Sequence, residues 1–163
     1  MNKLKAAIYG LGFMGQTHYR NLIKMKEVSV VAVCDIDLER TREVIDKEIK
    51  RYHNFDTMLE TEVLDFLVIC LPPFAHNGEF EKAAARGIHI FIEKPVALNT
   101  LKAKEMYDAA KLNNIISQVG YHQRFGSAIQ KLKKYMEEGV AGKPCLFDGI
   151  YACNSLHAPW WRD

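Results

Sequence analysis

The chain has 163 residues, which is enough for one domain of ordinary size or for one domain with part of another. Its formal charge is only +2, from 22 lysines and arginines against 20 acidic residues, and this near balance argues against a nucleic-acid-binding protein. No apolar run approaches a membrane span, the start lacks a signal peptide, and the four cysteines show no C-x-x-C spacing, so we expect a chain of the reduced cytoplasm without a membrane partner.

The most informative motif follows the first predicted strand, an apolar run over residues 4–9. It is a G-x-G-x-x-G sequence with glycines at Gly10, Gly12 and Gly15. A helical pattern comes next, and its predicted inner face consists of Met14, His18, Leu22 and Met25. This strand–loop–helix order is the context that the dinucleotide-binding fingerprint requires.

Each glycine has a physical task in that fingerprint. Gly10 would make the tight turn, Gly12 would let the backbone approach a pyrophosphate, and Gly15 would let the helix pack closely on the strand. The anion would rest on the free N–H groups at the helix amino end, which begins at Phe13 and Met14. The alternative is an ordinary glycine-rich turn that binds nothing.

The second predicted strand, residues 28–34, ends at Asp35, 20 residues after Gly15. An acidic residue at this place can accept hydrogen bonds from the adenosine ribose hydroxyls of NAD. Its charge would disfavour the 2′-phosphate of NADP, although Arg40 or Arg42 could compensate for it, so NADP stays possible.

Asp35 could instead cap the next helix. Asp37 suits that task better, because a helical pattern over residues 38–50 follows it directly. We therefore interpret Asp35 as the ribose ligand and Asp37 as the cap.

Strands and helices keep alternating through the rest of the chain. Strands are predicted at 51–55, 65–71, 88–92 and 115–119, and helices at 56–59, 75–86 and 99–113. This alternation predicts an α/β fold with a Rossmann-type, doubly wound parallel sheet.

Ligands of such sheets bind outside the carboxyl ends of the strands. Three segments fall there: residues 71–76, the triplet Glu93-Lys94-Pro95, and residues 120–125. A lysine beside a nicotinamide could donate a hydrogen bond to a substrate hydroxyl or carbonyl oxygen. A plain proline-rich turn and a surface Glu–Lys pair are the alternatives.

These motifs, in this order, resemble the glucose–fructose oxidoreductase and inositol dehydrogenase family, also called Gfo/Idh/MocA. The resemblance runs from about Lys3 to the last residue. It implies an NAD(P)-dependent oxidation or reduction of a sugar, polyol or cyclitol at a carbinol carbon. It also implies that Lys94 is the catalytic residue, presented by Glu93 and Pro95, and that the cofactor's ribose and diphosphate are flanked by Leu71, Pro72, Pro73 and His76.

Several further positions gain a role only from the resemblance. His122 and Arg124 would lie at the cofactor, with a helix-capping role as the alternative. Trp160 and Arg162 would line the substrate side, and no metal ligands are assigned. His18 fits a family position, but we interpret it as a satisfied, partly buried histidine.

The family continues beyond this length into a second domain that carries an Asp and a His for proton transfer. We therefore expect residues 1–122 to be the dinucleotide-binding domain and residues 123–163 to start a truncated second domain. A helix is predicted at 126–138 and a strand at 145–153, paired with the first domain or with another copy. We expect the short chain to bind NAD without turnover and the full-length protein to be a homo-oligomer.

Two other functions stay open at this point. One is a non-catalytic NAD-binding module or redox sensor, which the missing acid/base pair favours. The other is an S-adenosylmethionine-dependent transferase, but nothing in that chemistry requires Glu-Lys-Pro after the fifth strand.

Overall fold

The computed structural model describes residues 3–42, 44, 46–140, 142–150 and 152. The chain divides into two units, Met1–Tyr121 and His122–Asp163, each of which is described by itself. Within the described residues, no helix is both long and apolar enough to cross a bilayer.

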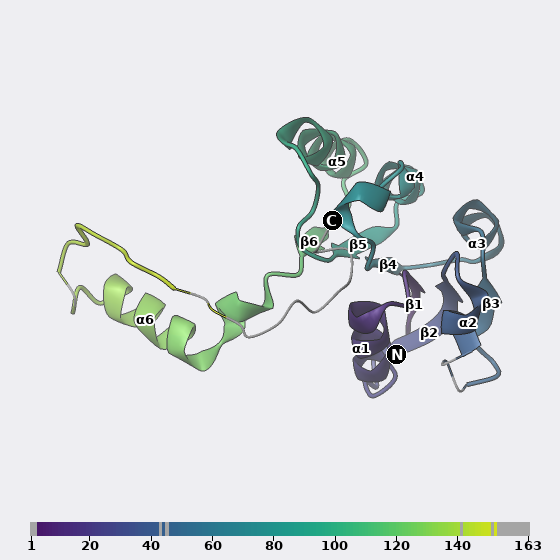
Figure 1. The fold of residues 1–163 in the computed structure, drawn as a ribbon, viewed down its shortest axis with the longest axis horizontal. Coiled ribbons are helices and arrows are strands. Elements are labelled where there is room, and N and C mark those ends of the chain that lie inside the picture. Colours follow the sequence, from purple (N-terminus) through teal and green to yellow (C-terminus); the bar gives the residue numbers. More distant parts are fainter. Residues whose placement is uncertain (1–2, 43, 45, 141, 151, 153–163) are drawn as a thin grey trace. The chain divides into compact units, whose positions relative to one another are not determined.

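The first unit is built on a six-stranded parallel sheet (Figure 1). Its strands are β1 (Leu4–Tyr9), β2 (Val28–Cys34), β3 (Lys50–Tyr52), β4 (Phe66–Ile69), β5 (His89–Ile92) and β6 (Ser117–Val119). Their order is β3-β2-β1-β4-β5-β6, so the direction of winding reverses between β1 and β4. This order is that of dinucleotide-binding sheets, and the predicted doubly wound fold is confirmed.

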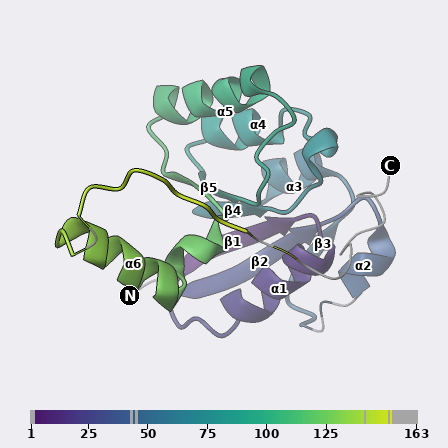
Figure 2. The same ribbon diagram turned by 60° about the vertical axis from the view of Figure 1, so that its left-hand side comes forward.

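Helices cover both faces of this sheet (Figure 2). On one face α3 (Phe55–Thr61), α4 (Glu79–Ala85) and α5 (Thr100–Leu112) pack on Ala7, Leu67 and Ile69. On the other face α1 (Phe13–Leu22) packs on Ile8, Val33 and Val68. Neighbouring residues of one strand thus enter opposite cores, which explains why the central strands are apolar almost throughout.

Helix α1 buries only part of the predicted face: Leu22 is buried and His18 is partly buried as predicted, but Met14 is only half-buried. Its buried residues are Gly15, Gln16, Tyr19 and Leu22, while Met25 lies beyond the helix and is exposed. The close approach of Gly15 to the glycine turn, described below, sets which side of α1 faces the sheet.

The predicted helix over 38–50 is wrong beyond its first turns. Helix α2 is only Leu38–Arg42, and Asp37 begins it as predicted by accepting a hydrogen bond from the Glu39 amide at 3.0 Å. The Arg51 guanidinium donates hydrogen bonds to the Thr41 and Val44 carbonyls at 3.2 and 2.6 Å. In a longer helix these carbonyls would accept from N–H groups of the helix itself. Val44 and Ile49 are buried nonetheless, so their spacing reflects burial without a helix.

Local features of the chain set where the next three helices begin. Asn54 caps α3 by accepting a hydrogen bond from the Thr57 amide at 2.9 Å. The helix therefore begins at Phe55, one residue before its predicted start. Helix α4 starts at Glu79 and not at Ala75, because a separate 3-10 turn, η1 (Pro73–Ala75), and Gly78 with φ +84° precede it. Helix α5 matches its prediction and is capped by Asn99, whose side chain accepts from the Lys102 amide at 2.9 Å.

The second unit contains a short 3-10 turn, η2 (His122–Phe125), and helix α6 (Ser127–Glu137). Gly139, with φ +72°, follows the end of α6 as predicted. The predicted strand over 145–153 is wrong for residues 145–150, which form no strand, while most of its remainder lies outside the described residues. A strand is not stable in isolation, because it needs the hydrogen bonds of a neighbouring strand.

Candidate functional site

The glycine turn is clamped between the ends of two strands. Gly10 has φ +90°, and its amide donates to the Cys34 carbonyl at 2.9 Å. A Cβ at Gly10 would lie 2.5 Å from the Cys70 carbonyl oxygen, so only glycine fits between β2 and β4.

Gly15 and Gly12 have opposite surroundings. A Cβ at Gly15 would lie 1.9 Å from the Gly10 carbonyl oxygen, so the helix rests on the turn. A Cβ at Gly12 would meet nothing within 4 Å. Gly12 is also the N-cap of α1 and makes no side-chain cap hydrogen bond, so the first N–H groups of the helix, at Phe13, Met14 and Gly15, receive no cap from it.

Asp35 holds this turn in place. Its side chain is 4% exposed, and its two oxygens accept hydrogen bonds from the Leu11 amide at 2.6 Å and the Asp37 amide at 2.9 Å. This structural task was missed by the sequence analysis. Each carboxylate oxygen can accept a second hydrogen bond, so these two bonds do not prevent Asp35 from binding a ribose hydroxyl. That role stays a prediction.

The two arginines after Asp35 differ in their partners. Arg40 lies 3.8 Å from Asp35 Oδ2 and 3.4 Å from Asp37 Oδ2. Arg42 pairs with Glu39 at 2.7 Å, and both of those side chains are exposed. Arg40 is therefore the cation beside the predicted ribose ligand.

Glu93 forms a second buried carboxylate, just after β5. Its side chain is 8% exposed; Oε1 is 2.8 Å from His18 Nε2 and Oε2 accepts from the Lys94 amide at 3.1 Å. Burial opposes ionisation of Glu93, but the hydrogen bonds from His18 and from the Lys94 amide outweigh it and lower its pKa below the ordinary value.

Lys94 follows at the surface. Its side chain is exposed, and no ion pair joins its ammonium to any residue that the structure describes. The Lys94–Pro95 peptide bond is cis. The side chain is thus free to donate hydrogen bonds to a ligand at the carboxyl edge of the sheet.

The segment after β4, residues 71–76, is more buried than expected for a proline-rich turn at a ligand site. Leu71 and Pro72 are half-buried and Pro73 is buried in η1. The His76 side chain is only 2% exposed, with Nδ1 hydrogen-bonded to Glu79 and Nε2 buried without a partner among the described residues. His76 thus sits inside the unit, at the start of α4.

Three other titratable groups lie near the glycine turn without being reactive. Burial, followed by the charge of Asp35, raises the pKa of the Cys34 thiol to about 12. Burial, followed by the charge of Glu93, raises the pKa of the Cys70 thiol as well. Burial likewise raises the pKa of Tyr9, which stacks on Phe55, to about 12. A protonated thiol is a weak nucleophile, so we assign both cysteines to packing and not to chemistry.

The remaining predicted site residues belong to the second unit or lie outside the description. His122 and Arg124 are exposed in η2. Trp160 and Arg162 lie outside the described residues.

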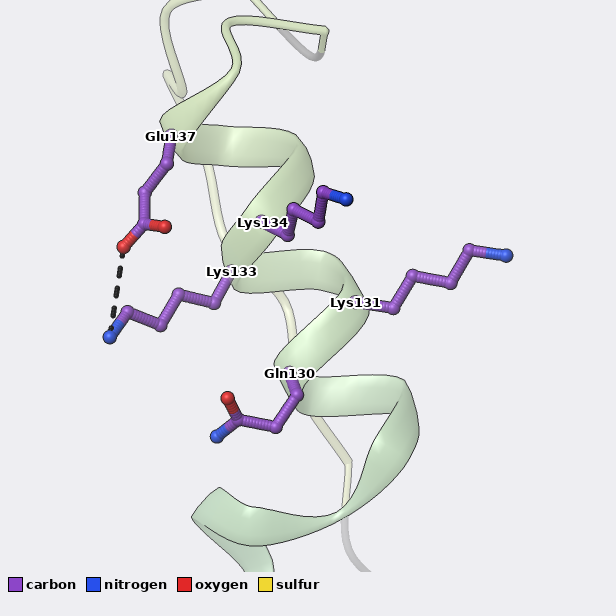
Figure 3. A pocket seen from close by; sticks show the side chains of 5 residues that line it. All are labelled: Gln130, Lys131, Lys133, Lys134 and Glu137. Carbon is purple, nitrogen blue, oxygen red and sulfur yellow. Dashed lines mark ion pairs between the residues drawn. The ribbon is translucent and has the colours of Figure 1, made fainter.

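A shallow hollow on α6 does not belong to the site. It is lined by five side chains of that one helix: Gln130, Lys131, Lys133, Lys134 and Glu137 (Figure 3). Lys133 pairs with Glu137 at 3.6 Å. These exposed side chains form a solvated face of the helix.

Comparison with known proteins gives a consistent result. The family model described as "Oxidoreductase family, NAD-binding Rossmann fold" (GFO_IDH_MocA) matches residues 4–121. The chain is 29% identical over 143 residues to myo-inositol 2-dehydrogenase of Thermotoga maritima, covering 86% of the chain and 43% of the relative. It is 30% identical over 153 residues to scyllo-inositol 2-dehydrogenase (NAD(+)) of Bacillus subtilis, covering 91% and 44%.

Solved structures show the same half-length match. An oxidoreductase from Agrobacterium radiobacter in complex with NAD+, L-tartaric acid and magnesium superposes with a TM-score of 0.81 at 28% identity, over 88% of this chain and 42% of that one. For myo-inositol 2-dehydrogenase from Lactobacillus plantarum the TM-score is 0.79 at 33% identity, over 87% and 43%. The chain therefore spans less than half the length of these relatives.

Proposed function

The chain belongs to the Gfo/Idh/MocA oxidoreductase family, and from this premise we propose that it binds NAD(H) at the carboxyl edge of its first unit for hydride transfer to or from a carbinol carbon of a sugar, polyol or cyclitol. The relatives named as inositol dehydrogenases support this substrate class. Because the chain covers less than half of them, the activity, the homo-oligomeric state and the cytoplasmic location of the whole protein are all part of the proposal.

The observation that carries the proposal is the contrast among the three glycines. Gly10 and Gly15 have no room for a side chain because the protein itself fills the space. Gly12 has free space in front of it, at the uncapped amino end of α1. Free N–H groups and the helix dipole favour an anion there, and a dinucleotide carries one in its diphosphate.

The residues around this point fit the rest of the cofactor. Asp35 lies beside the turn, where it would accept from a ribose hydroxyl and repel a 2′-phosphate, so we expect NAD to be preferred over NADP. Leu71, Pro72 and Pro73 would flank the ribose and diphosphate from the next strand end. His76 would support that wall from behind, because its side chain is buried. His122 and Arg124 stay candidates for the cofactor and Trp160 and Arg162 for the substrate side.

Lys94 is the residue of the described site that we assign to the chemistry. When bound, the nicotinamide supplies the hydride or accepts it. The Lys94 ammonium would donate a hydrogen bond to the substrate oxygen and stabilise negative charge that develops on it. It offers donors only, so the proton itself needs another group. We therefore propose that the 163 residues bind cofactor without turnover.

Calorimetric titration of the chain with NADH and with NADPH, which measures the affinity for each, tests the proposal. We expect saturable binding of one NADH per chain and weaker binding of NADPH. Absence of NADH binding at millimolar concentration would overturn the proposed function.

A further inference from the structure

A histidine–glutamate pair links two parts of the proposed site that are far apart in sequence. His18 lies on α1, the helix whose amino end faces the proposed diphosphate position. Its Nε2 is 2.8 Å from Oε1 of Glu93, which follows β5. The other oxygen of the same carboxylate, Oε2, accepts from the Lys94 amide at 3.1 Å. One buried carboxylate therefore joins α1 to the backbone that carries Lys94.

The surroundings leave this carboxylate a single position. A Cβ at Gly120, just after β6, would lie 2.9 Å from Oε1 and 3.1 Å from Oε2, so the carboxylate fills the space where a side chain would be. The His18 ring stands edge-on to Phe91, with ring centres 5.0 Å apart. Both members of the pair are thus fixed by packing as well as by their hydrogen bond.

The titratable groups that act on Glu93 come from three places in the unit. They are its partner His18 on α1, Cys70 just after β4, and Lys94, the next residue of the chain. From the end of β6, Gly120 packs against the carboxylate and brings no charge. Because burial favours the neutral carboxyl, Glu93 depends on its hydrogen bonds to remain ionised, and His18 supplies the one from a side chain.

We propose that His18 is a positioning residue for Lys94: by donating to Glu93 it holds the carboxylate that fixes the Lys94 backbone, and so sets where the Lys94 ammonium stands against the nicotinamide. The proposal deepens the proposed function and rests on it for the identity of the ligand. Without the donor, the carboxylate loses one of the contacts that hold it and Glu93 takes up its proton at a higher pH; both changes weaken the hydrogen bond from the Lys94 amide and loosen the turn.

The link can be measured without any cofactor. At 18.7 kDa the chain is suited to amide NMR, in which the Lys94 N–H reports the protonation of Glu93 during an acid titration. His18→Leu should raise the midpoint of that titration by about one pH unit or more, because the favourable partner is lost while burial remains. His18→Gln keeps a donor and should stay closer to the wild type. Arg20→Gln, an exposed change on the same helix, should leave the midpoint unchanged.

The effect of the pair on cofactor binding is measured with two ligands, NADH and ADP-ribose. ADP-ribose contains the diphosphate and both riboses but lacks the nicotinamide, so it reports on the diphosphate and ribose contacts, the amino end of α1 included, and not on the nicotinamide beside Lys94. We expect His18→Leu to weaken NADH binding by about fivefold and to leave ADP-ribose binding nearly unchanged. Lys94→Ala should cause a similar loss, and the double variant should lose little more than either single one, because both changes remove the same contact.

The outcomes separate this proposal from the function on which it rests. An unchanged Lys94 titration in His18→Leu overturns the positioning role, and so does an equal loss of NADH and ADP-ribose binding, which would mean that His18 acts on α1 only. If the wild type binds neither ligand, the proposed function fails, while the Lys94 titration still decides whether His18 acts through Glu93.

Discussion

Replacing two glycines of the same motif by alanine should separate folding from cofactor binding. A Cβ at Gly15 would lie 1.9 Å from the carbonyl oxygen of Gly10 and 2.9 Å from its carbon, and since both atoms are backbone, no side-chain rotation relieves the clash. Overpacking costs about 1–3 kcal/mol, and the better helix propensity of alanine returns at most about 1 kcal/mol. We expect Gly15→Ala to lower the free energy of unfolding by about 2 kcal/mol, or Tm by about 8 °C for a unit of this size.

Gly12→Ala is the matched control for stability. Its Cβ meets nothing within 4 Å, and its backbone angles, φ −66° and ψ −169°, suit any residue. The free energy of unfolding should stay within about 0.5 kcal/mol of the wild type. The added methyl group would occupy the space proposed for the diphosphate, so NADH affinity should fall by about tenfold or more, equal to about 1.4 kcal/mol.

Thermal unfolding followed by circular dichroism and titration with NADH measure the two effects on each variant. A Gly15→Ala chain that melts with the wild type would refute the packing argument. A Gly12→Ala chain that binds NADH with unchanged affinity would refute the diphosphate position.

Charged groups give three further predictions. Arg40→Ala should weaken NADPH binding about fivefold with little effect on NADH, whereas Arg42→Ala should affect neither cofactor, because Arg42 pairs with Glu39 and not with Asp35. Calorimetry with both cofactors measures this, and equal losses for NADH and NADPH would contradict it. Three carboxyls have pKa values below the ordinary range, so their stabilisation is present above about pH 4.3 and is lost as the pH falls through the folded-state values; urea unfolding at a series of pH values should show this decline, and a constant stability down to pH 3 would contradict it. These carboxyls are Glu62, Glu79 and Glu93. Arg51→Met should destabilise the chain by about 1–3 kcal/mol, because the Thr41 and Val44 carbonyls lose their donor; hydrogen exchange should speed up first around residues 41–49, and unchanged exchange there would speak against this role.

The sequence predicts most of the sheet, because its central strands are continuous apolar runs bounded by polar or glycine residues. The bounds of β1 and β2 agree with their predictions, and the glycine turn lies directly after β1 as predicted. Parallel strands buried on both faces leave this signature in the chain itself.

The failures lie where a distant residue decides a local conformation. Val44 and Ile49 have helical spacing, but Arg51 takes the carbonyls of this segment and the chain turns instead. The helical period of α1 was visible, but its rotation depends on the contact between Gly15 and Gly10, which no periodicity contains.

The acidic residues at the strand ends carry a more general point. Asp35 and Glu93 were predicted from their positions as a ligand and as part of a turn, and each accepts a backbone N–H from the loop that forms the proposed site, at Leu11 and at Lys94. A carboxylate accepting from a backbone N–H makes a strong, charge-assisted hydrogen bond, so it can hold a loop in the position that a ligand needs. The interpretation of His18 as a satisfied, partly buried histidine is confirmed, and its partner would have been found by asking which side chain donates to a buried Glu93, since a carboxylate with 8% exposure requires a hydrogen-bond donor. A sequence shows which residues stand at the edge of the sheet, whereas burial decides whether they meet the ligand or hold the loop that does.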